Sequence, residues 1–123
     1  MAYILIIEDN SGLREILAEM LEGEGYDVLT AEDGKKGLEL CHKNPVDLVI
    51  TDIVMPVKEG LGTICDLQRD FPDIKIIAIS GGGQGIKGVD YLETVQSMLG
   101  IKHVFSKPFS MGDILPMIKE LVG

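Results

Sequence analysis

Five residues with chemically active side chains each follow an apolar run of the kind that forms a β-strand. In chain order these residues are Glu8, Asp9, Asp52, Ser80 and Lys107. If the runs form parallel strands of one sheet, their carboxyl ends lie along the same edge, where ligands and chemistry gather in such sheets. Three carboxylates, one hydroxyl and one ammonium would then share a site.

A cluster of carboxylates needs a positive partner. Like charges about 4 Å apart repel by roughly 4 kcal/mol at an effective dielectric constant of 20, so a proton, a cation or a metal ion must offset them. Oxygen ligands with room for water suit Mg²⁺, which commonly binds one or two carboxylates together with phosphate oxygens. Taken singly, each acidic residue fits a helix cap or turn equally well, but the set points to phosphoryl chemistry.

The apolar runs that position these residues recur five times. They cover residues 3–7, 27–30, 46–50, 74–79 and 102–105. Each is separated from the next by a segment long enough for a helix, and the first, third and fourth runs consist almost entirely of Ile, Leu and Val. Such runs are typical of parallel strands covered by helices on both faces. The sequence therefore predicts an α/β fold with a doubly wound, five-stranded parallel sheet and five helices.

Helical periodicity is clearest in the first and last of the intervening segments. The first has apolar residues on one helical face, namely Leu13, Ile16, Leu17, Met20 and Leu21. The last covers residues 109–122, begins with a capping box from Ser110 to Asp113 and contains Pro116, which we expect to bend it. The other three helices are predicted at residues 33–43, 58–69 and 91–99.

Composition limits the classes of partner. The chain has 123 residues and a formal net charge of -9, which opposes binding to nucleic acid or to an anionic membrane surface. No signal peptide or spanning apolar segment is present, so we expect a cytoplasmic protein without membrane insertion. Cys41 and Cys65 lack a metal-ligand spacing, and we expect both to be buried free thiols.

The chain resembles the receiver domains of response regulators in two-component signalling, which have the chemotaxis-type, flavodoxin-like fold. The matching motifs are IIEDN at 6–10, TDIVMP at 51–56 with Gly60 beyond it, IS at 79–80 and SKPF at 106–109. Each motif alone is weak, whereas their order, spacing and positions at strand ends are specific together. The resemblance covers essentially the whole chain.

The resemblance implies a role for each residue of the acidic group. Asp52 is expected to accept the phosphoryl group as a carboxylate nucleophile. Asp9 and Asp52 are expected to ligate Mg²⁺ directly, Glu8 through water, and Val54 through its backbone carbonyl. Such a metal bridges the nucleophile and the phosphoryl oxygens and neutralises their charge.

The resemblance also implies roles for three residues that come later in the chain. Lys107 is expected to offer a mobile cation to the phosphoryl oxygens, and Ser80 to donate its hydroxyl to the bound phosphoryl group. Pro108 is expected to follow a cis peptide bond that aims Lys107 inward.

The resemblance also implies the partners. A histidine kinase or a histidine phosphotransfer protein would donate the phosphoryl group, and a downstream protein target would bind the face formed by helix 4, strand 5 and helix 5. We expect residues 1–123 to form a single receiver domain without an output domain, either acting alone or cut from a longer regulator or hybrid kinase. It is not expected to be an enzyme beyond catalysing its own phosphorylation and dephosphorylation.

Three other classes of protein share parts of this residue pattern. A flavodoxin-like electron carrier needs a phosphate-binding loop after the first strand, where Glu8 and Asp9 would repel the phosphate. A phosphatase of the haloacid-dehalogenase type carries a second Asp, its general acid, two residues after the nucleophile. This chain has Val54 at that position and so lacks the general acid. A pseudo-receiver that binds a partner without being phosphorylated stays open.

Some positions depart from the receiver pattern. Val104 stands where many receivers carry an aromatic switch residue, and Phe105 beside it points to the opposite face. We therefore expect signalling to run mainly through Ser80 and the glycine-rich residues after it. Val54 and Gly82 cannot orient an attacking water, which predicts slow loss of the phosphoryl group. The G-x-G-x-x-G spacing at residues 83–88 is not in the first βα turn, so it does not indicate a dinucleotide site.

Overall fold

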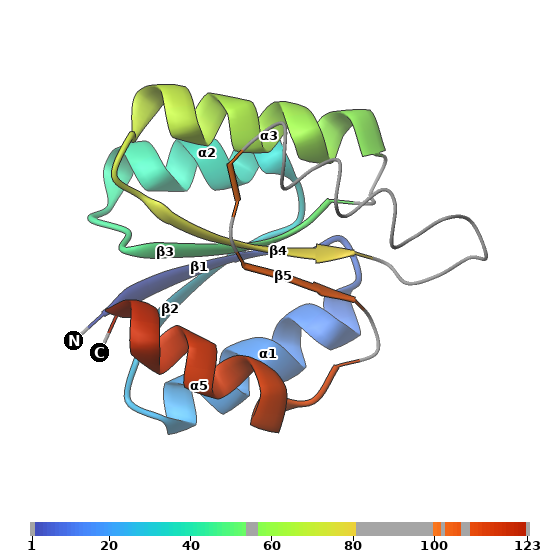
Figure 1. Ribbon diagram of the computed structural model, residues 1–123, viewed down its shortest axis with the longest axis vertical. Coiled ribbons are helices and arrows are strands. Elements are labelled where there is room, and N and C mark those ends of the chain that lie inside the picture. Colours follow the sequence, from blue (N-terminus) through green and yellow to red (C-terminus); the bar gives the residue numbers. More distant parts are fainter. Residues whose placement is uncertain (1, 54–56, 81–99, 102, 107–108, 123) are drawn as a thin grey trace.

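The fold is a five-stranded parallel sheet between two layers of helices (Figure 1). The structure is a computed structural model that describes residues 2–53, 57–80, 100–101, 103–106 and 109–122. The strands are β1 (Tyr3–Ile7), β2 (Asp27–Ala31), β3 (Leu48–Asp52), β4 (Lys75–Ser80) and β5 (His103–Ser106). They lie in the order β2-β1-β3-β4-β5, and every neighbouring pair is parallel. The predicted doubly wound α/β sheet is confirmed.

Four helices cover the two faces of the sheet within the described residues. They are α1 (Ser11–Gly23), α2 (Gly34–Lys43), α3 (Val57–Asp70) and α5 (Met111–Val122). Figure 1 shows α2 and α3 on one face and α1 and α5 on the other. The helix predicted at residues 91–99 lies outside the part of the chain that the structure describes.

The core follows from the alternation of side chains along each strand. In β1, Leu5 and Ile7 pack into the core beneath α2 and α3, while Ile4 and Ile6 pack into the core beneath α1 and α5. All four side chains are at most 1% exposed. Because both faces are buried, the strand must be apolar at every position, which explains the uninterrupted runs in the sequence.

The strand order creates the edge at which a site can form. From β1 the chain first adds β2 on one side and then crosses to place β3 on the other side of β1. Of the helices that follow β1 and β3, α1 lies on one face of the sheet and α3 on the other. The carboxyl ends of these two strands thus flank the point where the winding reverses.

Three helices begin at caps that the sequence encodes. The side chain of Asn10 accepts a hydrogen bond from the Leu13 N–H at 2.9 Å, and that of Asp33 accepts from Lys36 N–H at 2.8 Å. At α5 the Ser110 N–H donates to the Asp113 carboxylate at 3.3 Å, which is one of the two hydrogen bonds of a capping box. Pro116 lies inside α5, which continues to Val122.

The apolar face of α1 is wider than the face that the sheet covers. Leu17 and Leu21 are buried against the sheet, whereas Ile16 is 55% and Met20 is 45% exposed. Adjacent helical residues are rotated by about 100° from each other, so Ile16 and Met20 lie at the margin of the stripe. The predicted helix is confirmed, and only the central residues of its apolar face, Leu17 and Leu21, are buried.

The boundaries of β3 differ from the apolar run that predicted it. The run covers residues 46–50, but the strand begins at Leu48, which pairs with Ile4, and ends at Asp52, which pairs with Ile79. Pairing with neighbouring strands continues through the polar residues Thr51 and Asp52, so the strand is longer than its apolar part. Asp52 is therefore held inside the ladder rather than in the following loop.

The two cysteines have different environments. Both are free thiols, as predicted, and Cys41 of α2 is buried. The expectation of burial was wrong for Cys65, which is exposed. Its neighbours Ile64 and Leu67 are the residues of α3 that face the sheet, and this directs the side chain of Cys65 toward solvent.

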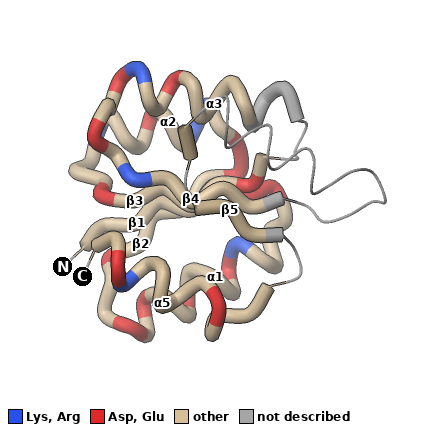
Figure 2. The backbone as a smooth tube through the Cα atoms, in the orientation of Figure 1, with Lys and Arg blue, Asp and Glu red and all other residues tan. Residues whose placement is uncertain are grey.

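Acidic side chains outnumber basic ones along the chain, in keeping with the net charge of -9 (Figure 2). Among the described residues, none of the helices combines the length and the apolar character needed to cross a bilayer.

Candidate functional site

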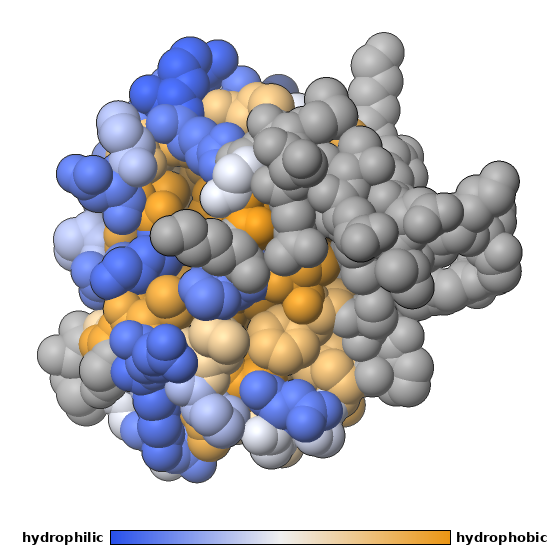
Figure 3. Space-filling view, viewed as in Figure 1, coloured by the Kyte–Doolittle hydropathy of each residue, from blue (hydrophilic) through white to orange (hydrophobic). Residues whose placement is uncertain are grey.

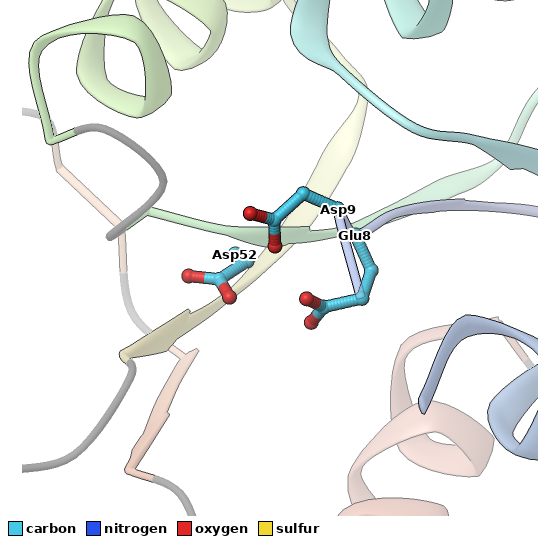
Figure 4. Close-up of side chains that lie close together, drawn as sticks. All are labelled: Glu8, Asp9 and Asp52. Carbon is cyan, nitrogen blue, oxygen red and sulfur yellow. The ribbon is translucent and has the colours of Figure 1, made fainter. Parts of the chain in front are cut away.

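Three carboxylates meet at the carboxyl ends of β1 and β3. Glu8 and Asp9 directly follow β1, and Asp52 is the last residue of β3. One oxygen from each of these side chains lies within 4.8 Å of the others. Figure 4 shows the three side chains pointing toward one another from the two neighbouring strand ends.

This cluster combines burial with like charge. Glu8 is 1% and Asp52 is 4% exposed, while Asp9 lies at the surface. Charges at such separations repel by roughly 3 to 4 kcal/mol per pair at an effective dielectric constant of about 20. The cluster is therefore strongly attractive to a cation that enters from the exposed side of Asp9.

Glu8 is held in place by its neighbours. Its N–H donates to the carbonyl of Ala31 at 3.0 Å, which extends the pairing of β1 with β2 by one residue. Its carboxylate accepts a hydrogen bond from the Asn10 N–H at 3.1 Å. The backbone and the side chain of Glu8 are thus both fixed before any ligand binds.

Sequence reasoning did not identify Arg14 as part of this region. Its Nη1 donates to the backbone carbonyl of Glu8 at 2.7 Å. Arg14 lies near the start of α1, where the helix dipole disfavours a cation. A basic residue in the first turn of a helix, five residues after an acidic pair, was the signal in the sequence that could have indicated this contact.

The donor set fits a hard divalent cation. All three side chains offer oxygen, and no nitrogen or sulfur ligand joins them among the described residues. Oxygen-only sites favour Mg²⁺, Ca²⁺ or Mn²⁺ over zinc or copper. The open side at Asp9 leaves room for water or phosphate oxygens, which suits the coordination habits of Mg²⁺.

The remaining predicted site residues are only partly described. Ser80 is the last residue of β4, and its backbone pairs in register with Ser106 of β5. Ser106 directly precedes Lys107 in the sequence, so the strand leading to Lys107 ends beside the strand that carries Ser80. Lys107, Val54 and the predicted cis bond before Pro108 lie outside the described residues.

The predicted orientation of the two neighbours in β5 is confirmed. Val104 packs against the core beneath α2 and α3, and Phe105 packs against the core beneath α1 and α5. The ring of Phe105 lies 6.4 Å from that of Phe109, centroid to centroid. Phe105 is therefore committed to the opposite face of the sheet and does not substitute for an aromatic side chain at position 104.

The fold and the site together define a doubly wound α/β protein with a carboxylate site at the reversal of its winding. The chain belongs to the response regulator receiver domain family, whose sequence profile matches residues 4–119. Receiver domains are signalling modules of two-component systems, which confirms the resemblance found in the sequence.

Two curated relatives illustrate the match in sequence. The chain is 34% identical over 119 residues to the probable transcriptional regulator ycf27 of Guillardia theta, covering 97% of this chain and 44% of the relative. It is 31% identical over 119 residues to the transcriptional regulatory protein CpxR of Escherichia coli K12, covering 97% of this chain and 48% of the relative. The chain thus spans less than half the length of these regulators.

Solved structures agree with this assignment. The response regulator TrrA of Thermotoga maritima, in complex with Mg²⁺ and beryllofluoride, superposes with a TM-score of 0.83 at 29% identity, covering 99% of this chain and 100% of the other. The chemotaxis protein CheY4 of Vibrio cholerae has a TM-score of 0.85 at 22% identity, covering 99% of each chain. At 22% identity, the similarity to CheY4 shows a shared fold and nothing more.

Proposed function

We propose that this chain is a phosphorylation-dependent signalling switch in which Asp52 accepts a phosphoryl group from a histidine kinase or a histidine phosphotransfer protein. The observation that carries the proposal is the convergence of Asp52 with Glu8 and Asp9 at the reversal of the sheet, within 4.8 Å. Membership of the receiver family supports the same reading. We further propose that the elements described form one receiver domain.

Asp9 and Asp52 are proposed as direct Mg²⁺ ligands, with Glu8 acting through water and Val54 through its carbonyl. When bound, Mg²⁺ would offset the charge that accumulates as an anionic phosphoryl group approaches three carboxylates. The fixed position of Glu8 and the open side at Asp9 support this division between an inner and an outer ligand.

The covalent step requires little from the protein besides positioning. A carboxylate oxygen of Asp52 attacks phosphorus, an O–P bond forms, and the N–P bond of the donor phosphohistidine breaks. The electron pair of that bond leaves with the imidazole, which then takes a proton from solvent. The ladder pairing of Asp52 with Ile79 holds the nucleophile still during this transfer.

Two further residues are proposed to act on the product. Lys107 would pair with the phosphoryl oxygens, and the Ser80 hydroxyl would donate to them. A phosphoryl group adds a charge of about -1.5 to -2, so these contacts form only in the phosphorylated state. Differential contacts of this kind shift a two-state domain toward one conformation.

The proposed target surface comprises helix 4, β5 and α5. Helix 4 lies outside the described residues, but β5 is an edge strand and α5 flanks it. Partly buried apolar side chains occur on these two elements and the segment between them, namely Val104, Phe105, Phe109 and Leu115. Figure 3 shows hydrophobic residues at the surface between the two helix layers on this side of the molecule, which suits the binding of a protein partner.

The proposal is tested by phosphorylation with a small-molecule donor. The intact protein, an Asp52→Asn variant and an Asp73→Asn control are incubated with acetyl phosphate and Mg²⁺ and then weighed by mass spectrometry. Asp73 is an exposed carboxylate in the loop between α3 and β4. We expect the wild type and the control to gain one phosphoryl group and the Asp52 variant to gain none.

Two outcomes would contradict the proposal. Phosphorylation of the Asp52 variant would place the acceptor elsewhere. Absence of phosphorylation in every protein, with acetyl phosphate and with a phosphorylated histidine phosphotransfer protein alike, would favour the pseudo-receiver that binds its partner without chemistry.

A further inference from the structure

The short connection between β1 and α1 carries two of the three carboxylates. It consists of Glu8, Asp9 and Asn10, because β1 ends at Ile7 and α1 begins at Ser11. Glu8 is anchored by hydrogen bonds at its N–H and at its carboxylate. Asn10 is anchored because its side chain caps α1.

Asp9 differs from its two neighbours. Its side chain is exposed, and its carboxylate makes no hydrogen bond or ion pair with any residue that the structure describes. No other side chain or backbone group among the described residues therefore fixes the orientation of this carboxylate. The direction in which it points is set by the backbone that carries it, and above all by the peptide plane that joins Glu8 to Asp9.

Arg14 holds that peptide plane. Its Nη1 donates to the Glu8 carbonyl oxygen at 2.7 Å, a short hydrogen bond from a charged donor. This oxygen belongs to the peptide between Glu8 and Asp9. Within the described residues Arg14 forms no ion pair with Glu8, Asp9 or Asp52, so its contact is with the backbone rather than with the carboxylates.

We infer that Arg14 is a positioning residue for Asp9: by fixing the Glu8–Asp9 peptide, it aims the Asp9 carboxylate at the cation site shared with Asp52. The inference rests on the proposed function, because it concerns the Mg²⁺ site through which Asp52 would be phosphorylated. Hydrogen bonds that orient a metal ligand commonly change metal affinity by about 10- to 100-fold when they are removed.

A purely electrostatic role for Arg14 predicts the opposite change in Mg²⁺ affinity when Arg14 is replaced. If the guanidinium served only as a counter-charge to the acidic cluster, it would compete with Mg²⁺ for the same negative potential. Its removal would then strengthen Mg²⁺ binding. If Arg14 positions Asp9, its removal weakens Mg²⁺ binding even though a positive charge has been taken away.

The experiment measures the Kd for Mg²⁺ by isothermal titration calorimetry on the full chain. Arg14→Met keeps an apolar stem and removes the donor, and Arg14→Lys keeps the charge and one donor group. Arg69→Met is the matched control, because Arg69 is exposed and pairs with Asp66 and Asp70 on α3. Urea unfolding in EDTA reports on stability without metal, which a merely structural role would change.

We expect the Kd of the Arg14→Met variant to rise about 10-fold, that of Arg14→Lys to rise less, and that of Arg69→Met to stay at the wild-type value. An unchanged or lower Kd for Arg14→Met would overturn the inference. If Arg14→Met does not fold, Arg14→Lys decides: a Kd equal to or below that of the wild type would overturn the inference in the same way.

Asp9→Asn separates this inference from the proposed function. If the wild type binds Mg²⁺ and Asp9→Asn weakens binding while Arg14→Met does not, only the inference about Arg14 fails. If the wild type does not bind Mg²⁺, or if Asp9→Asn binds it equally well, the proposed metal site itself is contradicted, whatever the result for Arg14.

Discussion

Gly37 of α2 lies directly against Ile7, the last residue of β1. A Cβ added at Gly37 would overlap the Cδ1 atom of Ile7 and lie 2.8 Å from its Cγ1 atom. Ile7 is 1% exposed and directly precedes Glu8. The close contact between α2 and β1 therefore lies next to the proposed site. It depends on the absence of a side chain at position 37.

Gly37→Ala should destabilise the protein. Ala is favoured over Gly in a helix by about 1 kcal/mol, whereas overpacking a buried position costs about 1 to 3 kcal/mol. Because Ile7 is enclosed and cannot rotate away freely, we expect a net loss of about 1 kcal/mol in the free energy of unfolding. Urea denaturation followed by circular dichroism measures this loss.

Gly62→Ala is the matched control for Gly37→Ala. Gly62 is an exposed residue of α3, and a Cβ built there meets nothing within 4 Å. Only the helix preference remains, so this substitution should stabilise the protein by about 0.5 to 1 kcal/mol. If both substitutions stabilised the protein, the packing between Gly37 and Ile7 would be looser than the structure shows.

Asp9→Asn should change the response of stability to Mg²⁺. In EDTA the substitution removes one of three like charges that lie within 4.8 Å, so the free energy of unfolding should rise, by up to about 1 kcal/mol at the exposed Asp9. A ligand that binds only the folded state stabilises it by RT ln(1 + [L]/Kd). The rise in Tm on adding Mg²⁺ should therefore be smaller for Asp9→Asn than for the wild type.

Thermal unfolding with and without Mg²⁺ provides this measurement, and Ca²⁺ at equal concentration tests selectivity. A lower Tm of Asp9→Asn in EDTA would contradict the repulsion argument. An equal rise in Tm for both proteins would contradict the assignment of Asp9 as a ligand.

The two cysteines should react with thiol reagents at very different rates. Burial raises the pKa of the Cys41 thiol to about 11, and the reactive species is the thiolate. Cys65 is exposed. At pH 8 we expect a chromogenic disulfide reagent to modify one thiol rapidly in the native protein and the second only after denaturation. Rapid modification of a Cys65→Ser variant would show that α2 opens readily.

Asp70 should contribute to stability only above acidic pH. It accepts hydrogen bonds from Arg69 Nε at 2.9 Å and pairs with His42 Nε2 at 3.1 Å, which links the ends of α2 and α3. The hydrogen bond from Arg69, and then that from His42, hold the pKa of Asp70 below its ordinary value. A lowered folded-state pKa stabilises the protein above the unfolded-state pKa of about 4, and this contribution disappears as the pH falls through the folded-state value.

Asp70→Asn should accordingly lower the urea midpoint at pH 7, and the difference from the wild type should shrink toward about pH 3. Asp73→Asn serves as the control, because Asp73 is exposed and forms no ion pair among the described residues. A difference for Asp70→Asn that is equal at both pH values would mean that the charge of Asp70 contributes nothing.

Local features of the fold could be predicted because their causes are local. The apolar run at Tyr3–Ile7 forms β1 with the expected bounds, and the caps at Asn10 and Asp33 start α1 and α2. Side-chain alternation also predicted that Val104 and Phe105 lie on opposite faces. In each case a residue's neighbours within a few positions decide the result.

Features that depend on pairing between distant strands were less predictable. The end of β3 at Asp52 follows from the ladder with Ile79 rather than from the apolar run, which stops at Ile50. The exposure of Ile16 follows from how much of α1 the sheet can cover. Periodicity along one segment carries no information about either.

The sequence by itself determined the alternation of strands and helices and the placement of Glu8, Asp9 and Asp52 at strand ends, because polarity and capping act over a few residues. Tertiary structure decided that β3 lies beside β1, which brings Asp52 within 4.8 Å of the other two carboxylates. It also decided that Arg14 reaches the carbonyl of Glu8. The physical reason is that lateral strand order and side-chain reach depend on packing between segments that are far apart in the chain, and only the folded chain brings those segments together.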